Sequence, residues 1–127
     1  MIYIVDNDQN IREGYRILLK SADFESKGFE TAEAFLKNFH AEETELLLLD
    51  IHLQGMNGFD LLKKLKKEDY HLPVIIITAN NENENRVQAL KYGVMAYLRK
   101  PIDSEALIDL IKYNLDIQKS NKRSIYS

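Results

Sequence analysis

Charged and polar residues that can bind metal ions or anionic groups stand at the ends of four short apolar runs in this 127-residue chain. They are Asp6, Asn7 and Asp8 after the first run, Asp50 and Thr78 at the ends of two central runs, and Lys100 just after the last. Carboxylates drawn toward one point repel each other, and a hard divalent cation with oxygen ligands, commonly Mg²⁺, relieves that repulsion. Such a cation implies a phosphoryl group, whose negative oxygens can share the metal and a lysine.

The reaction favoured by these side chains is the transfer of a phosphoryl group onto a carboxylate. A carboxylate can attack phosphorus to give an aspartyl phosphate, and Asp50 is the candidate nucleophile. The metal and Lys100 would neutralise charge on the equatorial oxygens in the transition state, and Thr78 could donate its hydroxyl to the same group. Each residue taken alone is also explained as a turn, cap or surface residue. Their coincidence at several strand ends is what indicates a site.

The elements that must position these residues follow from the apolar pattern, which predicts strands alternating with helices. The expected strands are residues 1–5, 24–29, 46–49, 74–78 and 94–98. This alternation implies a parallel sheet with helices on both faces, because each crossover returns the chain in the same direction. In an open parallel sheet, ligands bind beyond the carboxyl ends of the strands, which is where the charged residues stand.

Five helices are expected between and after these strands, and some of their ends are marked by polar residues or glycine. Asp8 can cap the first helix, because its carboxylate can accept hydrogen bonds from free backbone N–H groups. Asn57 and Asp60 are spaced as a cap and its reciprocal partner at the third helix. The fourth helix begins in the Asn/Glu-rich residues 80–85 and ends at Gly93.

The composition is that of one globular domain, with 45% hydrophobic and 29% charged residues. The longest apolar runs are far shorter than the roughly 20 residues that a membrane helix needs. There is no export leader and no cysteine, so a cytoplasmic location is expected. The net charge of −3 provides no general attraction for nucleic acid, and direct binding of DNA or of a membrane is not expected.

Three segments resemble the receiver domains of two-component signalling, the CheY-like superfamily, and the resemblance runs from Ile2 to about Lys119. Residues 47–58 (LLLDIHLQGMNG) are similar to that family's phosphoacceptor strand and glycine-rich loop. Residues 74–79 (VIIITA) and 97–101 (YLRKP) resemble its phosphoryl-contacting strand and its aromatic switch with a Lys-Pro pair. The resemblance implies an α/β, flavodoxin-like, doubly wound sheet of five parallel strands in the order 2-1-3-4-5, with five helices.

Carried over position by position, the resemblance implies a role for each residue. Asp50 is then the phosphoacceptor, Thr78 the phosphoryl-sensing hydroxyl, Tyr97 a rotating aromatic and Lys100 the phosphate-binding cation. The implied ligands of Mg²⁺ come from the first loop and from the acceptor segment: Asp6, Asn7, Asp8, Asp50 and His52 through its backbone carbonyl. A cis bond between Lys100 and Pro101 is expected, which is plausible because the second residue is proline.

Two positions depart from the family's pattern. Two adjacent acids usually begin the site, whereas here Asp6 is followed by Asn7, and the next acid is Asp8. An amide oxygen can ligate Mg²⁺ but has no formal charge, so metal affinity is expected to fall unless Asp8 or water compensates. Gln54 stands where a proline is common, which loosens the loop after Asp50. Neither change removes the acceptor, the hydroxyl or the lysine.

The resemblance also implies partners and a division of the chain. Residues 1–119 are expected to form the receiver and residues 120–127 a polar tail or the start of a linker. The expected donor is a sensor histidine kinase, a phosphotransfer protein or a small phosphodonor, and the chain is expected to catalyse only its own phosphorylation and dephosphorylation. A homodimer is left open.

Phosphorylation is expected to draw Thr78 and Lys100 toward Asp50 and to let Tyr97 turn inward. The surface of helix 4, strand 5 and helix 5 would then change and control an output domain or a downstream protein. The residues expected on that surface are Arg86, Leu90, Tyr97, Arg99 and Lys112.

Three other functions are each compatible with part of the sequence. A haloacid-dehalogenase-like phosphatase would use Asp6 as nucleophile and Asp8 as acid/base, but it requires Thr or Val where Asn10 stands and an acidic pair after the lysine. A pseudo-receiver, an interaction module regulated without phosphate, is favoured by Asn7 alone. A flavodoxin-like flavin binder needs a first loop that accepts phosphate, and the acidic residues 6–8 would repel it.

Overall fold

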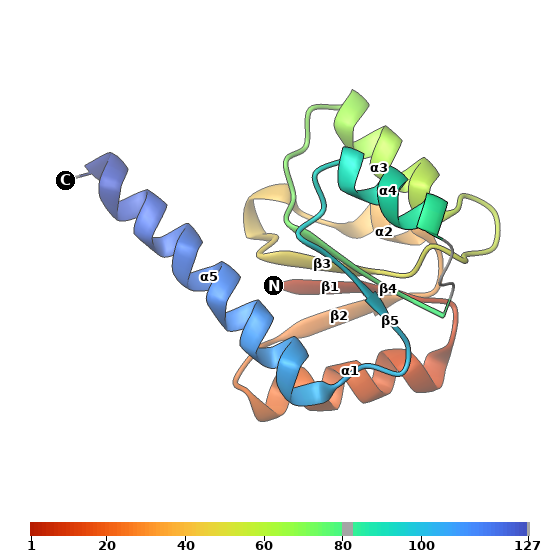
Figure 1. Ribbon diagram of the computed structural model, residues 1–127, viewed down its shortest axis with the longest axis horizontal. Coiled ribbons are helices and arrows are strands. Elements are labelled where there is room, and N and C mark those ends of the chain that lie inside the picture. Colours follow the sequence, from red (N-terminus) through yellow and green to blue (C-terminus); the bar gives the residue numbers. More distant parts are fainter. Residues whose placement is uncertain (80–82, 127) are drawn as a thin grey trace.

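A computed structural model describes residues 1–79 and 83–126 of the chain, in which five strands alternate with five α-helices (Figure 1). The strands are β1 (Ile2–Val5), β2 (Ser26–Phe29), β3 (Leu46–Leu49), β4 (Val74–Thr78) and β5 (Ala96–Arg99). The helices are α1 (Gln9–Ser21), α2 (Ala32–Asn38), α3 (Gly58–Lys67), α4 (Asn83–Lys91) and α5 (Ser104–Tyr126), with a short 3-10 turn at Ala41–Glu43.

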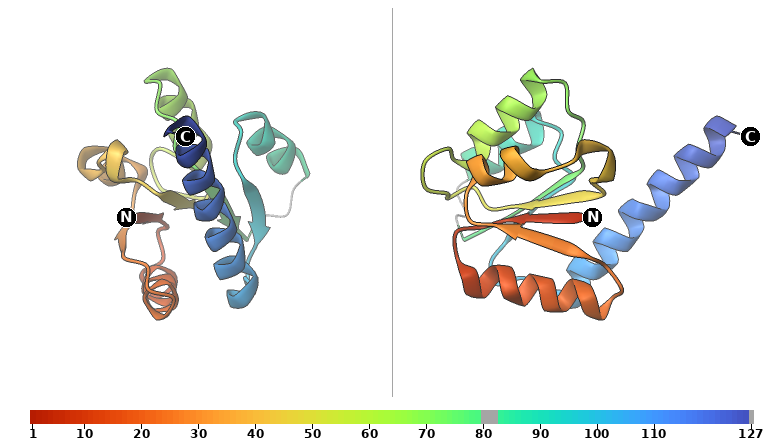
Figure 2. Two further views of the ribbon diagram at one scale, coloured as in Figure 1. Left: turned by 90° about the vertical axis from the view of Figure 1, so that its left-hand side faces the viewer. Right: turned by 180° about the vertical axis from the view of Figure 1, so that it is seen from behind.

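The five strands form one parallel sheet in the order β2-β1-β3-β4-β5, which confirms the predicted topology. Helices α2, α3 and α4 cover one face and α1 and α5 the other, as Figures 1 and 2 show. In the register of the sheet, Val5 pairs with Leu49 and Leu49 with Ile76. The carboxyl ends of the central strands therefore lie at the same edge.

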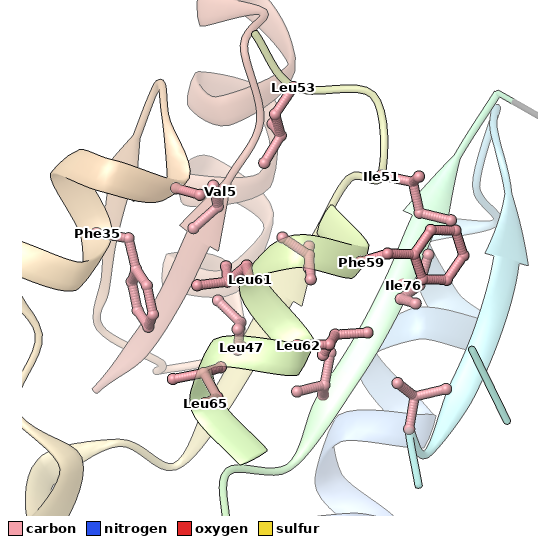
Figure 3. Close-up of a cluster of buried hydrophobic side chains, with 14 of the residues drawn as sticks. Val5, Phe35, Leu47, Ile51, Leu53, Phe59, Leu61, Leu62, Leu65 and Ile76 are labelled. Atoms are coloured by element: carbon pink, nitrogen blue, oxygen red, sulfur yellow. The ribbon is translucent and has the colours of Figure 1, made fainter. Parts of the chain in front are cut away.

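The central strands are apolar without interruption because both faces of the sheet are buried. Val5, Leu47 and Ile76 point to the α2–α3–α4 side, into the cluster drawn in Figure 3. Ile4 and Leu48 point to the α1–α5 side, in a second cluster. Successive side chains of a strand alternate between the two faces, so each central strand contributes to both cores.

The predicted helix caps are present. The Asp8 carboxylate accepts from the backbone N–H groups of Asn10 (2.8 Å) and Ile11 (3.3 Å) at the start of α1. Asn57 and Asp60 form a reciprocal capping box at the start of α3, with bonds of 2.9 and 3.2 Å. These bonds satisfy backbone donors that have no partner inside the helix.

Some boundaries differ from the sequence-based expectation. The second strand begins at Ser26 instead of residue 24, and the fifth covers Ala96–Arg99 instead of residues 94–98. The last helix continues to Tyr126, so residues 120–126, expected to be a polar tail or the start of a linker, are helical. Residues 80–82 of the predicted fourth-helix start lie outside the described residues. Within the described part, no helix combines the length and apolarity required to cross a bilayer.

Candidate functional site

The backbone ladder of the sheet continues past the strands and fixes the residues at their ends. The N–H of Asp6 donates to the carbonyl of Phe29 (3.1 Å), and the N–H of Asp50 donates to that of Val5 (3.0 Å). At the other side of the site, the N–H of Lys100 donates to the carbonyl of Thr78 (2.9 Å). The residues predicted from separate parts of the sequence are thus brought to one edge.

Lys100 joins the two acids of this edge. Its Nζ lies 2.8 Å from Oδ2 of Asp6 and 2.9 Å from Oδ2 of Asp50. Asp6 and Asp50 are almost fully buried, at 2% and 6% exposure, and Thr78 is completely buried at the end of β4. The Lys100–Pro101 bond is cis, as the sequence predicted.

The remaining oxygen of each acid is held by its own loop. Asp6 Oδ1 accepts from the N–H of Asp8 (2.9 Å), and Asp50 Oδ1 accepts from the N–H of His52 (3.1 Å). Each carboxylate therefore points one oxygen at the lysine and the other at a backbone donor. These bonds fix the orientation of both carboxylates.

The electrostatics of the edge reflect two buried acids and one cation. Burial raises the pKa of Asp6 above its ordinary value of 3.8, and the hydrogen bonds from Lys100 and from the Asp8 backbone offset this only in part. Burial alone would lower the pKa of Lys100, but its bonds to Asp6 and Asp50 outweigh that effect and raise the pKa above 10.5. The lysine is held as an ammonium, and the site keeps a surplus of acidic groups.

The other predicted metal ligands lie nearer to solvent. Asn7 and His52 are exposed and line an open hollow of about 520 Å³ together with the loop after Asp50. The carboxylate of Asp8 faces the start of α1 instead, where it is the cap described above. Among residues 1–79 and 83–126, no cluster of three or more His, Cys, Asp or Glu side chains is arranged to hold a metal.

The donors at this edge nevertheless suit one hard cation. The two acids, the Asn7 amide and the His52 carbonyl all offer oxygen atoms, and the hollow that Asn7 and His52 line leaves room for water. Mg²⁺ prefers oxygen ligands, commonly binds through one or two carboxylates and retains several of its waters. The residues present therefore fit Mg²⁺ with two carboxylates, without a third.

The predicted switch residue lies inside the protein. Tyr97 is buried at 7% exposure, in the cluster on the α2–α3–α4 side. The prediction that Tyr97 lies on the surface of α4, β5 and α5 is therefore wrong, because its ring packs in the core. The other residues predicted for that surface, Arg86, Leu90, Arg99 and Lys112, are exposed. Leu90 is 54% exposed, which is high for a leucine.

Two further residues that the sequence did not single out support the site. Arg12 Nη1 donates to the backbone carbonyl of Asp6 (2.6 Å), and its stem lies against Gly28 of β2. Tyr15 of α1 is buried within electrostatic reach of the two acids, and burial raises the pKa of its hydroxyl to about 12. Arg12 and Tyr15 lie one and two turns into α1. These positions indicate a role at the site only once the packing of that helix is known.

The chain matches the response regulator receiver domain family over residues 2–112. It is 31% identical over 111 residues to the transcriptional regulatory protein FixJ of Bradyrhizobium diazoefficiens, covering 87% of this chain and 54% of FixJ. It is 33% identical over 112 residues to the DNA-binding transcriptional regulator NtrC of Escherichia coli (strain K12), covering 88% of this chain and 24% of NtrC. The chain thus spans about half of FixJ and about a quarter of NtrC.

A solved structure agrees with this match. The CheY-like response regulator receiver domain protein from Methanospirillum hungatei JF-1 is 32% identical, with a TM-score of 0.83, covering 94% of this chain and 96% of that one. The fold, the site at the carboxyl edge of the sheet and the sequence similarity therefore lead to one assignment. This chain belongs to the response regulator receiver domain family of two-component signalling.

Proposed function

We propose that this receiver accepts a phosphoryl group on Asp50. The observation that carries the proposal is the contact of Lys100 Nζ with both Asp50 and Asp6 at the edge where β4 ends in Thr78. A carboxylate oxygen of Asp50 attacks phosphorus, the bond from phosphorus to the donor's histidine nitrogen breaks, and that nitrogen leaves with the electron pair and takes up a proton. A small acyl phosphate would serve in the same way, with its carboxylate leaving.

The protein's own groups prepare this step. The N–H of His52 fixes one oxygen of Asp50, and Lys100 is placed to neutralise the phosphoryl oxygens as they approach. The hydroxyl of Thr78, at the end of the neighbouring strand, would donate to the new phosphoryl group. The chemistry requires little more than positioning and charge neutralisation, which these groups supply.

Mg²⁺, when bound, would supply additional charge neutralisation at the phosphoryl oxygens. The residues that would hold it are Asp6, Asp50, Asn7 through its side-chain oxygen and His52 through its backbone carbonyl. Asp8 would take part through water, because its Oδ1 caps α1. With Asn7 in place of an acid, the site is expected to bind Mg²⁺ more weakly than one with three carboxylates.

Phosphorylation would be transmitted through Thr78 and Tyr97. The added charge would pull Thr78 and Lys100 toward Asp50 and shift the packing of Tyr97, and with it the face of α4, β5 and α5. Receiver relatives imply a histidine kinase as input and an output domain or protein. We place the receiver in residues 1–119, with the continuation of α5 as the connection to the output.

Acetyl phosphate and Mg²⁺ provide the direct test. The wild type is expected to gain one phosphoryl group by intact mass, Asp6→Asn to gain it slowly, and Asp50→Asn to gain none. Labelling of Asp50→Asn at the wild-type rate would contradict the proposal.

Two alternatives give different outcomes in the same assay. A phosphatase with Asp6 as nucleophile would lose labelling in Asp6→Asn and keep it in Asp50→Asn, and the use of Asp8 as a helix cap already disfavours that enzyme. A phosphate-independent module would remain unlabelled, and its NMR spectrum would not respond to beryllofluoride with Mg²⁺.

A further inference from the structure

The loop between β3 and α3 carries the acceptor at one end and an implied metal ligand near it. Its two ends are tied within the loop and to α3. The N–H of Gly58 donates to the carbonyl of Ile51 (2.9 Å), and the N–H of Asn57 donates to Asp60 (3.2 Å). His52 lies between these ties and contributes, with the loop residues after it, to the hollow beside Asn7.

The tip of this loop contains two residues with few conformational restrictions of their own, although Leu53 beside them is buried in the core cluster on the α2–α3–α4 side. Gln54 does not restrict φ, and Gly55 has a φ of +74°, in the left-handed region that glycine adopts without strain. Such residues lose much conformational freedom on folding, so the order of the tip must come from contacts.

A carboxylate from another element supplies such a contact. Glu33 of α2 accepts from the backbone N–H of Met56 through Oε1 at 3.2 Å. A Cβ on Gly55 would come within 2.6 Å of Glu33 Oε2, so the carboxylate lies directly against the glycine. Of the hydrogen bonds given for the backbone N–H groups of residues 52–56 in the described part, this one comes from outside the loop.

Glu33 is itself on a firmly placed element. Thr31 caps α2 by accepting from the N–H of Ala34 (3.0 Å), and Ala32 and Phe35 of the same helix are completely buried. Glu33 lies in the first turn, where a carboxylate is stabilised by the helix dipole. The contact to Met56 therefore connects the loop to a packed helix.

We propose that Glu33 is a positioning residue for the phosphorylation site. By holding Met56 it fixes the loop that presents the His52 carbonyl and forms a wall of the hollow beside Asn7. This inference rests on the proposed function, because the affinity at stake is that for Mg²⁺. Losing an outer support of a metal site commonly costs 10- to 100-fold in affinity, and an exposed contact belongs at the lower end.

Three variants test the proposal: Glu33→Ala, Glu33→Gln and, as a matched control, Glu30→Ala, which removes an exposed acid just before α2. The measurements are Mg²⁺ affinity by calorimetry, amide exchange of Met56 by NMR and the free energy of unfolding in urea. Glu33→Ala is expected to weaken Mg²⁺ binding about tenfold and to speed exchange at Met56. Glu33→Gln keeps an oxygen acceptor and should lie close to the wild type, as should the control.

The outcomes distinguish a positioning role of the Glu33 side chain from a general effect of its negative charge. Equal losses in Glu33→Gln and Glu33→Ala would overturn the proposal, because removal of the negative charge alone would then suffice. Wild-type Mg²⁺ affinity in Glu33→Ala, beside a wild type that binds Mg²⁺ and is labelled, would overturn this inference and leave the proposed function standing. A wild type that neither binds Mg²⁺ nor is labelled would overturn both.

Discussion

Lys100 balances the charge of two acids that have little access to water. Its ammonium lies within 2.9 Å of both Asp6 and Asp50, and its own side chain is only 18% exposed. Removing one partner of a buried ion pair leaves an uncompensated charge, which costs more than the pair itself contributes. The lysine is therefore expected to matter for stability as well as for phosphoryl transfer.

Lys100→Met should destabilise the protein by about 3 kcal/mol at pH 7 in the absence of Mg²⁺. The loss should shrink toward acid pH, because protonation of Asp6 removes one of the two charges. Urea unfolding at pH 5 and pH 7 measures this difference, with Lys100→Arg as the control that retains the charge. A loss that does not depend on pH would contradict this account.

Asp6→Asn should act in the opposite direction. The pKa of Asp6 is raised above 3.8 in the folded protein. As the pH rises, Asp6 therefore loses its proton in the unfolded chain before it does so in the folded protein. Over this pH range the free energy of unfolding falls, until Asp6 is also ionised in the folded protein. The variant lacks this cost. In EDTA, its unfolding midpoint in urea should exceed that of the wild type by more at pH 7 than at pH 4, and a reversed order would refute the assignment.

The residues of the site were predictable to different degrees. Asp50, Thr78 and Lys100 could be placed together because each stands at the end of a strand, and a parallel sheet brings such ends to one edge. Arg12 and Glu33 could not, because each donates to or accepts from a backbone atom of another element. That pairing has no trace in the spacing of residues along the chain.

At the scale of elements, α3 begins in direct contact with the acceptor segment. A Cβ on Gly58 would lie 2.8 Å from the carbonyl oxygen of Asp50 and 2.8 Å from the Cα of Ile51. Both are backbone atoms, which cannot turn aside as a flexible side chain can. The absence of a side chain at Gly58 thus sets how closely the helix approaches the acceptor.

Gly58→Ala should destabilise the protein by about 1–3 kcal/mol and slow labelling by acetyl phosphate, because the acceptor backbone must move. Gly14→Ala is the matched control, since Gly14 lies within α1 and a Cβ there meets nothing within 4 Å. The control should gain about 0.5–1 kcal/mol from its higher helix propensity. Urea unfolding and labelling rates would show whether the two glycines differ in this way.

The helix starts were predicted better than the extents of the outer elements. Asp8 and Asn57 mark helix starts by a local hydrogen bond, which depends on residues close in sequence. The extent of β5 depends on where its partner β4 offers hydrogen bonds, and this is set by the sheet. The polarity of residues 120–126 predicted a tail or the start of a linker, whereas α5 includes them, and no Gly or Pro interrupts the helix there.

At the scale of the molecule, one sheet separates two cores. Leu47 and Leu48 are neighbours on β3, yet one packs with α2, α3 and α4 and the other with α1 and α5. Both side chains are at most 1% exposed. Because the strand is shared, loosening one core disturbs the backbone of the other.

Leu47→Ala and Leu48→Ala should each destabilise the protein by about 2–5 kcal/mol, since both leave a cavity at a fully buried position. Each variant should still unfold in one transition, with an unchanged dependence on urea, because the two cores share every central strand. Unfolding followed by circular dichroism and by tyrosine fluorescence would check this. Transitions that differ between the two probes would show that the cores unfold separately.

The course of α5 has a mechanical consequence. The helix packs on the sheet through Leu107 and Ile111, is held to the carbonyl of Glu45 by a hydrogen bond from Gln118 (3.4 Å), and continues to Tyr126, projecting away from the body of the molecule (Figures 1 and 2). From Gln118 to Tyr126 it extends about 12 Å at 1.5 Å per residue. A tilt of about 10° at Gln118 would move the far end by about 2 Å. The projecting end would then act as a lever arm that magnifies small rearrangements at the sheet.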